Sequence, residues 1–432
     1  MKIGNKRLTT DLLVGLGLRA LGAVSSFALT WLIARMFGAR IVGLYQVGFT
    51  TVTLLSLVAV LSMDVVLVRR ITPLIEAGNF TTASGTFRGT RALVARMGLA
   101  LSLACALLAW PFARHVMDEP GLAPYIALLA PAILLLSLMR VQNALLRSLG
   151  KILISQSLEG VLYVTIAIAG LALLGWMLPA LDPLAAPVLL VVGLIVSVAA
   201  GFAATRRYLR EWPRAAEPVP VEVKSGAAIA AGPIISQSGN WLILLAITAM
   251  ISAVDAGIFR VAVLTCMLIQ LVNTSFATMA GPYLARAADA GDRAQIRKTI
   301  LIAGGIGVVI ASPVGLVALA FPQFVLGLFG PEFTSGALAL QLLAVSQLIN
   351  VLAGPVGIAL IMQNREKTVL WVEVAATLSG LAIAVALLSS WGIEGAALGL
   401  LVASLIRNGV NWVLLWFSEP QHAPSGRAKP NP

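Results

Sequence analysis

The chain has 432 residues, of which 59% are apolar and only 11% are charged, and its mean hydropathy is +0.95. Soluble proteins carry about 25% charged residues, so the composition excludes a soluble domain and indicates an integral membrane protein. The formal net charge of +12 would also suit a nucleic-acid-binding protein. The basic residues concentrate instead in the connections on one side of the apolar segments, as is typical of membrane proteins. Nucleic acid is therefore not expected as a partner.

Twelve apolar segments follow one another along the chain, each long enough to cross a lipid bilayer as a helix. Such a crossing takes about 20 residues. The segments lie near residues 12–37, 43–68, 92–113, 121–146, 152–177, 184–204, 226–251, 256–283, 299–329, 337–362, 368–390 and 393–417. We therefore expect an all-α polytopic membrane protein with twelve transmembrane helices.

The basic residues of the connections favour one side of these segments. Only Arg35, Arg40 and Arg114 fall on the side opposite the N-terminus, whereas most Lys and Arg residues fall on the N-terminal side. Basic residues concentrate on the cytoplasmic side of membrane proteins, so we expect both termini in the cytoplasm. No cleavable signal peptide is expected, because the first apolar segment is too long for the apolar core of one.

The sequence repeats itself at a spacing of 214 residues. Residues 43–47 (GLYQV) return as residues 257–261 (GIFRV), and Glu159 returns as Glu373. The copies predict two parallel six-helix repeats around a central cavity, since an even number of crossings returns the second copy to the same side. The expected parts are an N-terminal bundle (1–205), a basic cytoplasmic linker (206–225), a C-terminal bundle (226–418) and a cytoplasmic tail (419–432).

Residues suited to catalysis or metal binding are scarce. Cys105 and Cys266 lie inside apolar segments, and the only histidines are His115 and His422, which leaves too few ligands for a metal site. The sequence has no phosphate-binding loop of the Walker type. No segment outside the apolar ones is long enough for a catalytic domain. An enzyme, a cofactor and a metal site are therefore not expected.

Several basic and amide side chains lie inside the apolar segments, where a charge costs about 2.5–3.5 kcal/mol. We expect nine of them to line a substrate-binding cavity: Arg19, Arg140, Asn143, Asn240, Arg260, Gln270, Asn273, Arg407 and Asn411. A guanidinium near the cytoplasmic end of a helix can also extend its charge to the membrane surface. This alternative stays open for Arg19 and Arg407.

Three acidic side chains, Asp64, Glu159 and Glu373, also lie at membrane depth. A buried carboxylate can carry a coupling proton or cation, or it can form an ion pair with a neighbouring arginine. Glu159 and Glu373 occupy equivalent positions of the repeat, whereas the arginines do not. The ion-pair role is therefore favoured for the glutamates and the cargo-binding role for the arginines.

Short motifs in a characteristic order carry a resemblance to a known family. Residues 34–38 (ARMFG), 281–286 (GPYLAR) and 328–333 (LFGPEF) resemble polysaccharide repeat-unit flippases of the O-antigen (Wzx-like) type. These flippases are part of the multidrug/oligosaccharidyl-lipid/polysaccharide exporter superfamily. The resemblance covers about residues 5–415.

The resemblance implies a cargo and a mechanism. Such flippases move polyprenyl-pyrophosphate-linked sugar repeat units of lipopolysaccharide from the cytoplasmic to the periplasmic leaflet of the bacterial inner membrane by alternating access, and a polysaccharide polymerase is an expected partner. Arginines suit this cargo because guanidinium binds phosphate oxygens in pairs and stays ionised. Two alternatives remain: a multidrug or cation antiporter, expected to have acidic cavity residues, and a peptidoglycan lipid-precursor flippase, expected to have two further spans.

Overall fold

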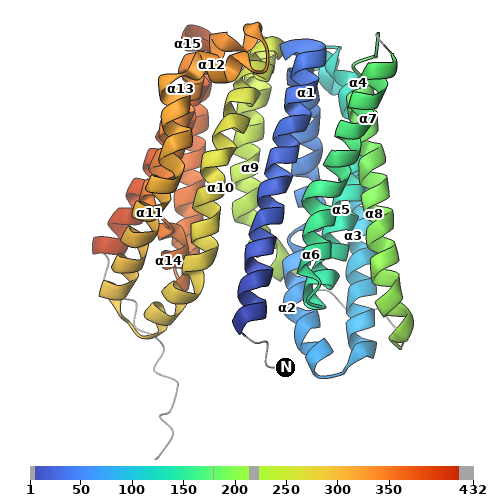
Figure 1. The fold of residues 1–432 in the computed structure, drawn as a ribbon, viewed down its shortest axis with the longest axis vertical. Coiled ribbons are helices and arrows are strands. Elements are labelled where there is room, and N and C mark those ends of the chain that lie inside the picture. Colours follow the sequence, from blue (N-terminus) through green and yellow to red (C-terminus); the bar gives the residue numbers. More distant parts are fainter. Residues whose placement is uncertain (1–4, 179, 214–222, 418–432) are drawn as a thin grey trace, which may run out of the picture.

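The computed structural model describes residues 5–178, 180–213 and 223–417, and every regular element in these ranges is a helix (Figure 1). The N-terminal half contains α1 (Asn5–Val60), α2 (Met63–Glu76), α3 (Phe80–His115), α4 (Leu122–Leu129), α5 (Pro131–Ser148), α6 (Ile152–Gln156), the π-helix η1 (Ser157–Leu162), α7 (Tyr163–Met177) and α8 (Ala185–Glu211). The C-terminal half contains α9 (Val223–Met250), α10 (Ala253–Asp289), α11 (Arg293–Ala320), α12 (Pro322–Gly327), the 3₁₀-helix η2 (Pro331–Gly336), α13 (Ala337–Ala353), α14 (Val356–Met362) and α15 (Glu366–Phe417). The expected all-α membrane fold is confirmed.

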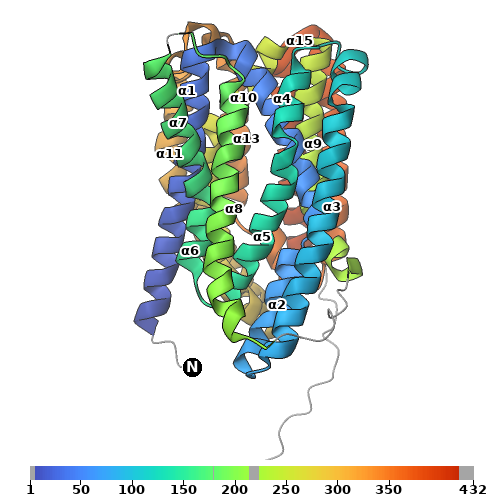
Figure 2. The same cartoon turned by 90° about the vertical axis from the view of Figure 1, so that its right-hand side faces the viewer.

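Within the described ranges, ten helical segments are long and apolar enough to cross a membrane. Two single helices contain a glycine with non-helical backbone angles, Gly38 in α1 (φ 81°) and Gly392 in α15 (φ 57°), a region of φ that favours glycine. A straight helix of 52 residues, the length of α15, would measure about 78 Å, far more than the roughly 30 Å core of a bilayer. Figure 2 shows α1 reversing direction at the end opposite the N-terminus. The predicted twelve spans are compatible with these lengths and remain a prediction.

The repeated motif lies where the two halves meet, and most contacts between the halves join α1 to α9 and α10. A Cβ atom on Gly43 would overlap the carbonyl oxygen of Ala253, and a Cβ atom on Gly257 would overlap that of Ala39. Both pairs are related by the 214-residue spacing, so the contact has two-fold symmetry. Glycine at both positions allows the two backbones to touch.

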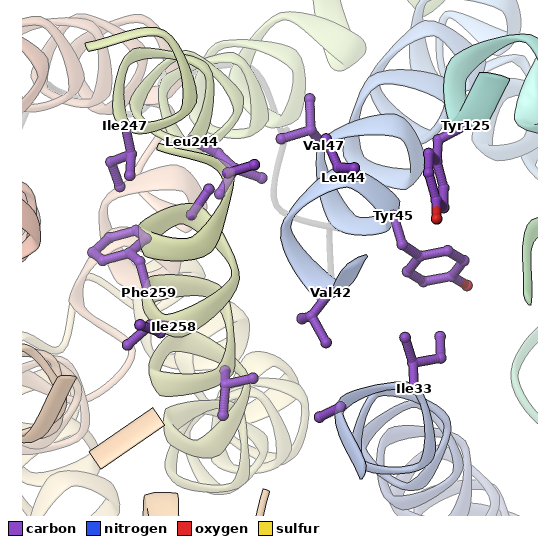
Figure 3. Packing of buried hydrophobic residues seen from close by; sticks show 14 of the residues in the cluster. Ile33, Val42, Leu44, Tyr45, Val47, Tyr125, Leu244, Ile247, Ile258 and Phe259 are labelled. Carbon is purple, nitrogen blue, oxygen red and sulfur yellow. The ribbon is translucent and has the colours of Figure 1, made fainter. Parts of the chain in front are cut away.

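The apolar residues that follow these glycines pack into their own half (Figure 3). Tyr45 of α1 points toward Tyr125 of α4, whereas Ile258 and Phe259 of α10 lie on the side of α9, near Ile247. All five side chains are buried. Each copy of the motif therefore turns its glycine toward the other half and its large side chains toward its own core.

At the end opposite the N-terminus, α1 is bonded to the segment around η2. The backbone N–H of Ala39, directly after the bend at Gly38, donates to Oε1 of Glu332 at 2.7 Å. Trp31 Nε1 donates to the carbonyl oxygen of Leu328 at 2.8 Å. The bend would otherwise leave a backbone N–H without a helical acceptor, so a side chain of the C-terminal half satisfies the backbone of the N-terminal half.

Candidate functional site

A cavity of about 180 Å³ lies inside the C-terminal half, between α9, α10, α13 and α15. Its wall is rich in amide side chains, contributed by Gln237, Asn240, Gln270, Gln347 and Asn350. Two arginines, Arg260 and Arg407, also line it, and the described lining residues include neither Asp nor Glu. The cavity therefore offers hydrogen-bond donors and acceptors together with positive charge.

Arg407 of α15 lines this cavity and also forms an ion pair. Its Nε lies 2.7 Å from Oε2 of Glu373, on the same kinked element. The Nε–H is not aligned with a hydrogen-bond acceptor, so the contact is mainly Coulombic. A carboxylate this close lowers the cost of holding a guanidinium at membrane depth.

A hydrogen-bond network joins α13 to α15 beside the ion pair. Oδ1 of Asn350 accepts from the Ser404 hydroxyl at 2.6 Å and from Nδ2 of Asn408 at 2.7 Å. Nδ2 of Asn350 donates to Oε1 of Gln347 at 3.2 Å. These bonds fix the orientation of the two amides that α13 presents to the cavity.

Arg260 connects the cavity to the N-terminal half. Its Nε donates to Oε1 of Gln46 at 3.1 Å, and Nε2 of Gln46 donates to the Thr30 hydroxyl at 3.1 Å. Positions 46 and 260 are equivalent in the repeat. Two equivalent positions can touch only near the two-fold axis that relates the copies, so Arg260 lies at the centre of the interface between the halves.

A second charged cluster lies in the N-terminal half. Arg147 of α5 lies 3.4 Å from Asp64 of α2 and 3.6 Å from Glu159 of η1. Arg140, two turns away on α5, is half-buried and within electrostatic range of Tyr163. Glu159 stands on a π-helical turn, a feature that often marks functional sites. Both predicted glutamates are thus paired with arginines, although at different positions of the repeat.

The structure brings four of the nine predicted cavity residues together, namely Asn240, Arg260, Gln270 and Arg407. Arg140, Asn143, Asn273 and Asn411 do not line this cavity. The side chain of Arg19, on α1, falls outside the described residues.

Two of the remaining asparagines are enclosed by the protein. Asn143 of α5 is fully buried, and neither of its amide atoms has a hydrogen-bond partner among the described residues. Asn411 is buried with its Oδ1 unpartnered in that same part of the chain. Asn273 is half-buried on α10, one turn beyond Gln270.

The sequence prediction did not include Gln347 and Asn350 among the cavity residues. A signal for them exists: they are three residues apart in an apolar segment, and residues three apart share one face of a helix. The amide of Asn350 is held by Ser404 and Asn408, which lie more than 50 residues further along the chain. No local pattern connects the two pairs.

Comparison with known sequences identifies the family. Residues 13–288 match the family described as polysaccharide biosynthesis protein. The chain belongs to this family. No curated protein sequence matches it significantly.

Solved structures with a fold similar to that of this chain include transporters. An inward-facing multidrug resistance transporter of the MATE family, MOP superfamily, has a TM-score of 0.76 at 14% identity over 94% of this chain and 97% of that chain. The lipid II flippase MurJ, in an inward closed conformation, has a TM-score of 0.71 at 11% identity over 93% and 87%. A MOP-superfamily transporter from Pyrococcus furiosus, described as having a binding pocket of reverse polarity, has a TM-score of 0.67 at 15% identity over 95% and 94%. The protein is therefore a multi-pass membrane protein with the fold of MOP-superfamily transporters, and these relatives are not enzymes.

Proposed function

We propose that the protein is a flippase that moves polyprenyl-pyrophosphate-linked sugar repeat units from the cytoplasmic to the periplasmic leaflet of the bacterial inner membrane. The observation that carries the proposal is the polarity of the cavity, where the charged residues among the described lining are Arg260 and Arg407. Guanidinium groups bind pyrophosphate oxygens in pairs, and amides bind sugar hydroxyls. Membership of a polysaccharide biosynthesis family supports a sugar cargo.

In this proposal both termini lie in the cytoplasm, and the bundles 1–205 and 226–418 rock against each other at the interface that contains Gln46 and Arg260. The bonds between α1 and the segment around η2, including that of Ala39 with Glu332, hold the halves together at the end of the molecule opposite the N-terminus. The lipid tail would stay in the bilayer while the head group occupies the cavity. A polysaccharide polymerase would receive the delivered repeat unit.

The arginines also weigh against one alternative. A cationic drug would be repelled by Arg260, and Glu373, the carboxylate beside the described cavity lining, is already paired with Arg407. A peptidoglycan lipid-precursor flippase would handle the same pyrophosphate-lipid chemistry, so the cavity alone does not separate it from the proposed function. The two cargoes are separated by which polymer the cell fails to make.

The test is complementation of a gene deletion with single variants, followed by staining of surface polysaccharide. Arg260→Ala and Arg407→Ala are expected to abolish surface display at normal protein abundance. Arg69→Ala is the matched control, since this exposed arginine of α2 lies outside the cavity, and it should display fully. Full display by both cavity variants would refute the proposal. Accumulation of peptidoglycan precursor with normal surface polysaccharide would instead favour the alternative flippase.

A further inference from the structure

A second cavity, of about 670 Å³, lies between α3 and α8 in the N-terminal half. Four arginines line it: Arg88 and Arg91 on α3, and Arg206 and Arg210 on α8. Figure 2 shows α3 and α8 on either side of α5, on the face turned away from the C-terminal half. This cavity shares no lining residue with the cavity of the C-terminal half.

The described residues provide no carboxylate that pairs with the charge of this arginine cavity. In the described part of the chain none of the four arginines forms an ion pair with a carboxylate. Arg88 lies close enough to Arg91 to repel it, and Arg206 and Arg210 share one helix face because they are four residues apart. The preference for basic residues on the cytoplasmic side does not explain why four converge on one cavity. An anion in the cavity would relieve this repulsion.

Aromatic rings hold part of the cavity in place. The Arg91 guanidinium lies 5.6 Å from the ring centre of Phe87 and 5.5 Å from that of Phe202. Trp212 is buried and lies 5.4 Å from the ring of Phe80. Cation–π contact with two rings restricts where the guanidinium can lie, while its N–H groups can still donate to an anion.

The arginine cavity is not part of the duplicated scaffold. At the 213-residue spacing that relates residues 76–79 to 289–292, Arg88 corresponds to Leu301 and Arg91 to Gly304. The C-terminal half therefore lacks these two arginines. A feature present in one copy only is not needed to build a repeat.

We propose that the arginine cavity binds the phosphate head group of an anionic phospholipid in the leaflet at the N-terminal end of the molecule. Large apolar side chains are exposed on the same helices further toward the middle of the membrane, including Leu99 and Leu103 on α3 and Ile195 on α8. They provide a surface for acyl chains next to the phosphate site. Basic pockets between transmembrane helices bind head groups of this kind, and a lipid with two phosphates matches four arginines best.

The experiment measures lipid binding to the purified full-length protein in detergent by native mass spectrometry, with cardiolipin, phosphatidylglycerol and phosphatidylcholine as probes. Wild type is expected to bind cardiolipin most tightly and phosphatidylcholine least. The double variant Arg206→Ala, Arg210→Ala should bind cardiolipin about 30-fold more weakly, since each arginine in contact with the lipid phosphates should contribute a factor of about five. Both side chains are exposed, so the thermal unfolding midpoint without added lipid should not change.

The matched control is the double variant Arg69→Ala, Arg207→Ala, which loses the same charge. Arg207 stands between the two tested arginines on α8, is exposed and does not line the cavity. The affinity of this control variant for cardiolipin should be within about twofold of that of wild type. An equal loss in the control would overturn the proposal, because general attraction would then explain the binding.

Two further probes test the nature of the ligand. Polyprenyl pyrophosphate bound at this cavity in preference to both anionic phospholipids would assign it to the carrier lipid, and the phospholipid assignment would be wrong. Displacement of cardiolipin by equimolar inorganic phosphate would show that acyl chains contribute nothing, which also contradicts the proposal. The result of these lipid-binding experiments does not depend on the proposed transport function, since none of the four arginines of this cavity lines the cavity in the C-terminal half.

Discussion

The guanidinium of Arg407 borders the cavity on one side and Glu373 on the other, with Nε 2.7 Å from the carboxylate. The equivalent glutamate of the first copy, Glu159, pairs with Arg147 on α5. The repeat thus keeps the glutamate in both halves, while the arginine comes from a different position in each. A paired arginine can still bind an anion, because its remaining N–H groups point elsewhere.

Paired substitutions separate the ion pair from cargo binding at Arg407. Arg407→Leu alone leaves Glu373 without its partner at membrane depth, and we expect the free energy of unfolding to fall by about 1–3 kcal/mol, because the pair is partly exposed. Arg407→Leu combined with Glu373→Leu should recover most of that stability but no surface display. Thermal unfolding and complementation measure the two effects. Normal display by the double variant would show that Arg407 serves the scaffold alone.

The hydrogen bond between Gln46 and Arg260 joins equivalent positions, so it predicts the result of exchanging them. Gln46→Arg places two guanidiniums together near the axis, and repulsion should strongly reduce transport. Adding Arg260→Gln restores one arginine and one glutamine in exchanged places, which allows the same bond with the donor and acceptor sides reversed. Complementation by the exchanged pair should exceed that of Gln46→Arg alone. Equal failure of both would show that the cargo needs the guanidinium on α10 itself.

At the scale of helices, the approach of α1 to α10 depends on residues without side chains. Gly43 and Gly257 let the two backbones touch, and the next residues of each copy fill the core of their own half. The same helices carry Gln46 and Arg260 one turn further on. A change in the separation of α1 and α10 therefore acts directly on the hydrogen bond at the axis.

Replacing Gly43 with alanine should destabilise the protein, although alanine usually stabilises a helix relative to glycine. Ala is better than Gly within a helix by about 1 kcal/mol, so Gly305→Ala in α11, where a Cβ meets nothing within 4 Å, should leave the unfolding midpoint unchanged or raise it. Gly43→Ala would overlap the Ala253 carbonyl, and we expect a loss of about 1–3 kcal/mol from overpacking. Thermal unfolding of the two purified variants compares them. A midpoint for Gly43→Ala as high as that of Gly305→Ala would contradict the contact.

For the whole molecule, local properties of the sequence were sufficient to predict the class of fold. The length of each apolar segment is set by the bilayer, and the 214-residue repeat is visible without coordinates. Which polar residues meet depends on helix rotation and on contacts far apart in sequence. Asn143 satisfies the same local criterion as Asn240, yet it is fully buried and does not line the cavity. The bond between Ala39 and Glu332 spans 293 residues, and no pattern near either residue indicates it.

The charge of the proposed cargo gives a prediction for the complete transport cycle. Moving about two negative charges outward across an inside-negative potential of 100 mV releases on the order of 4–5 kcal/mol, because the field drives anions outward. In proteoliposomes with a fluorescent polyprenyl-pyrophosphate oligosaccharide, an inside-negative potassium diffusion potential should accelerate outward movement several-fold relative to zero potential, and the opposite potential should slow it. Symmetric potassium and protein-free liposomes are the controls. Arg260 and Arg407 remain part of the protein when the cargo leaves, so they do not cancel the transferred charge. A rate independent of potential would mean that a cation crosses with the cargo, which the arginine-lined cavity does not provide for.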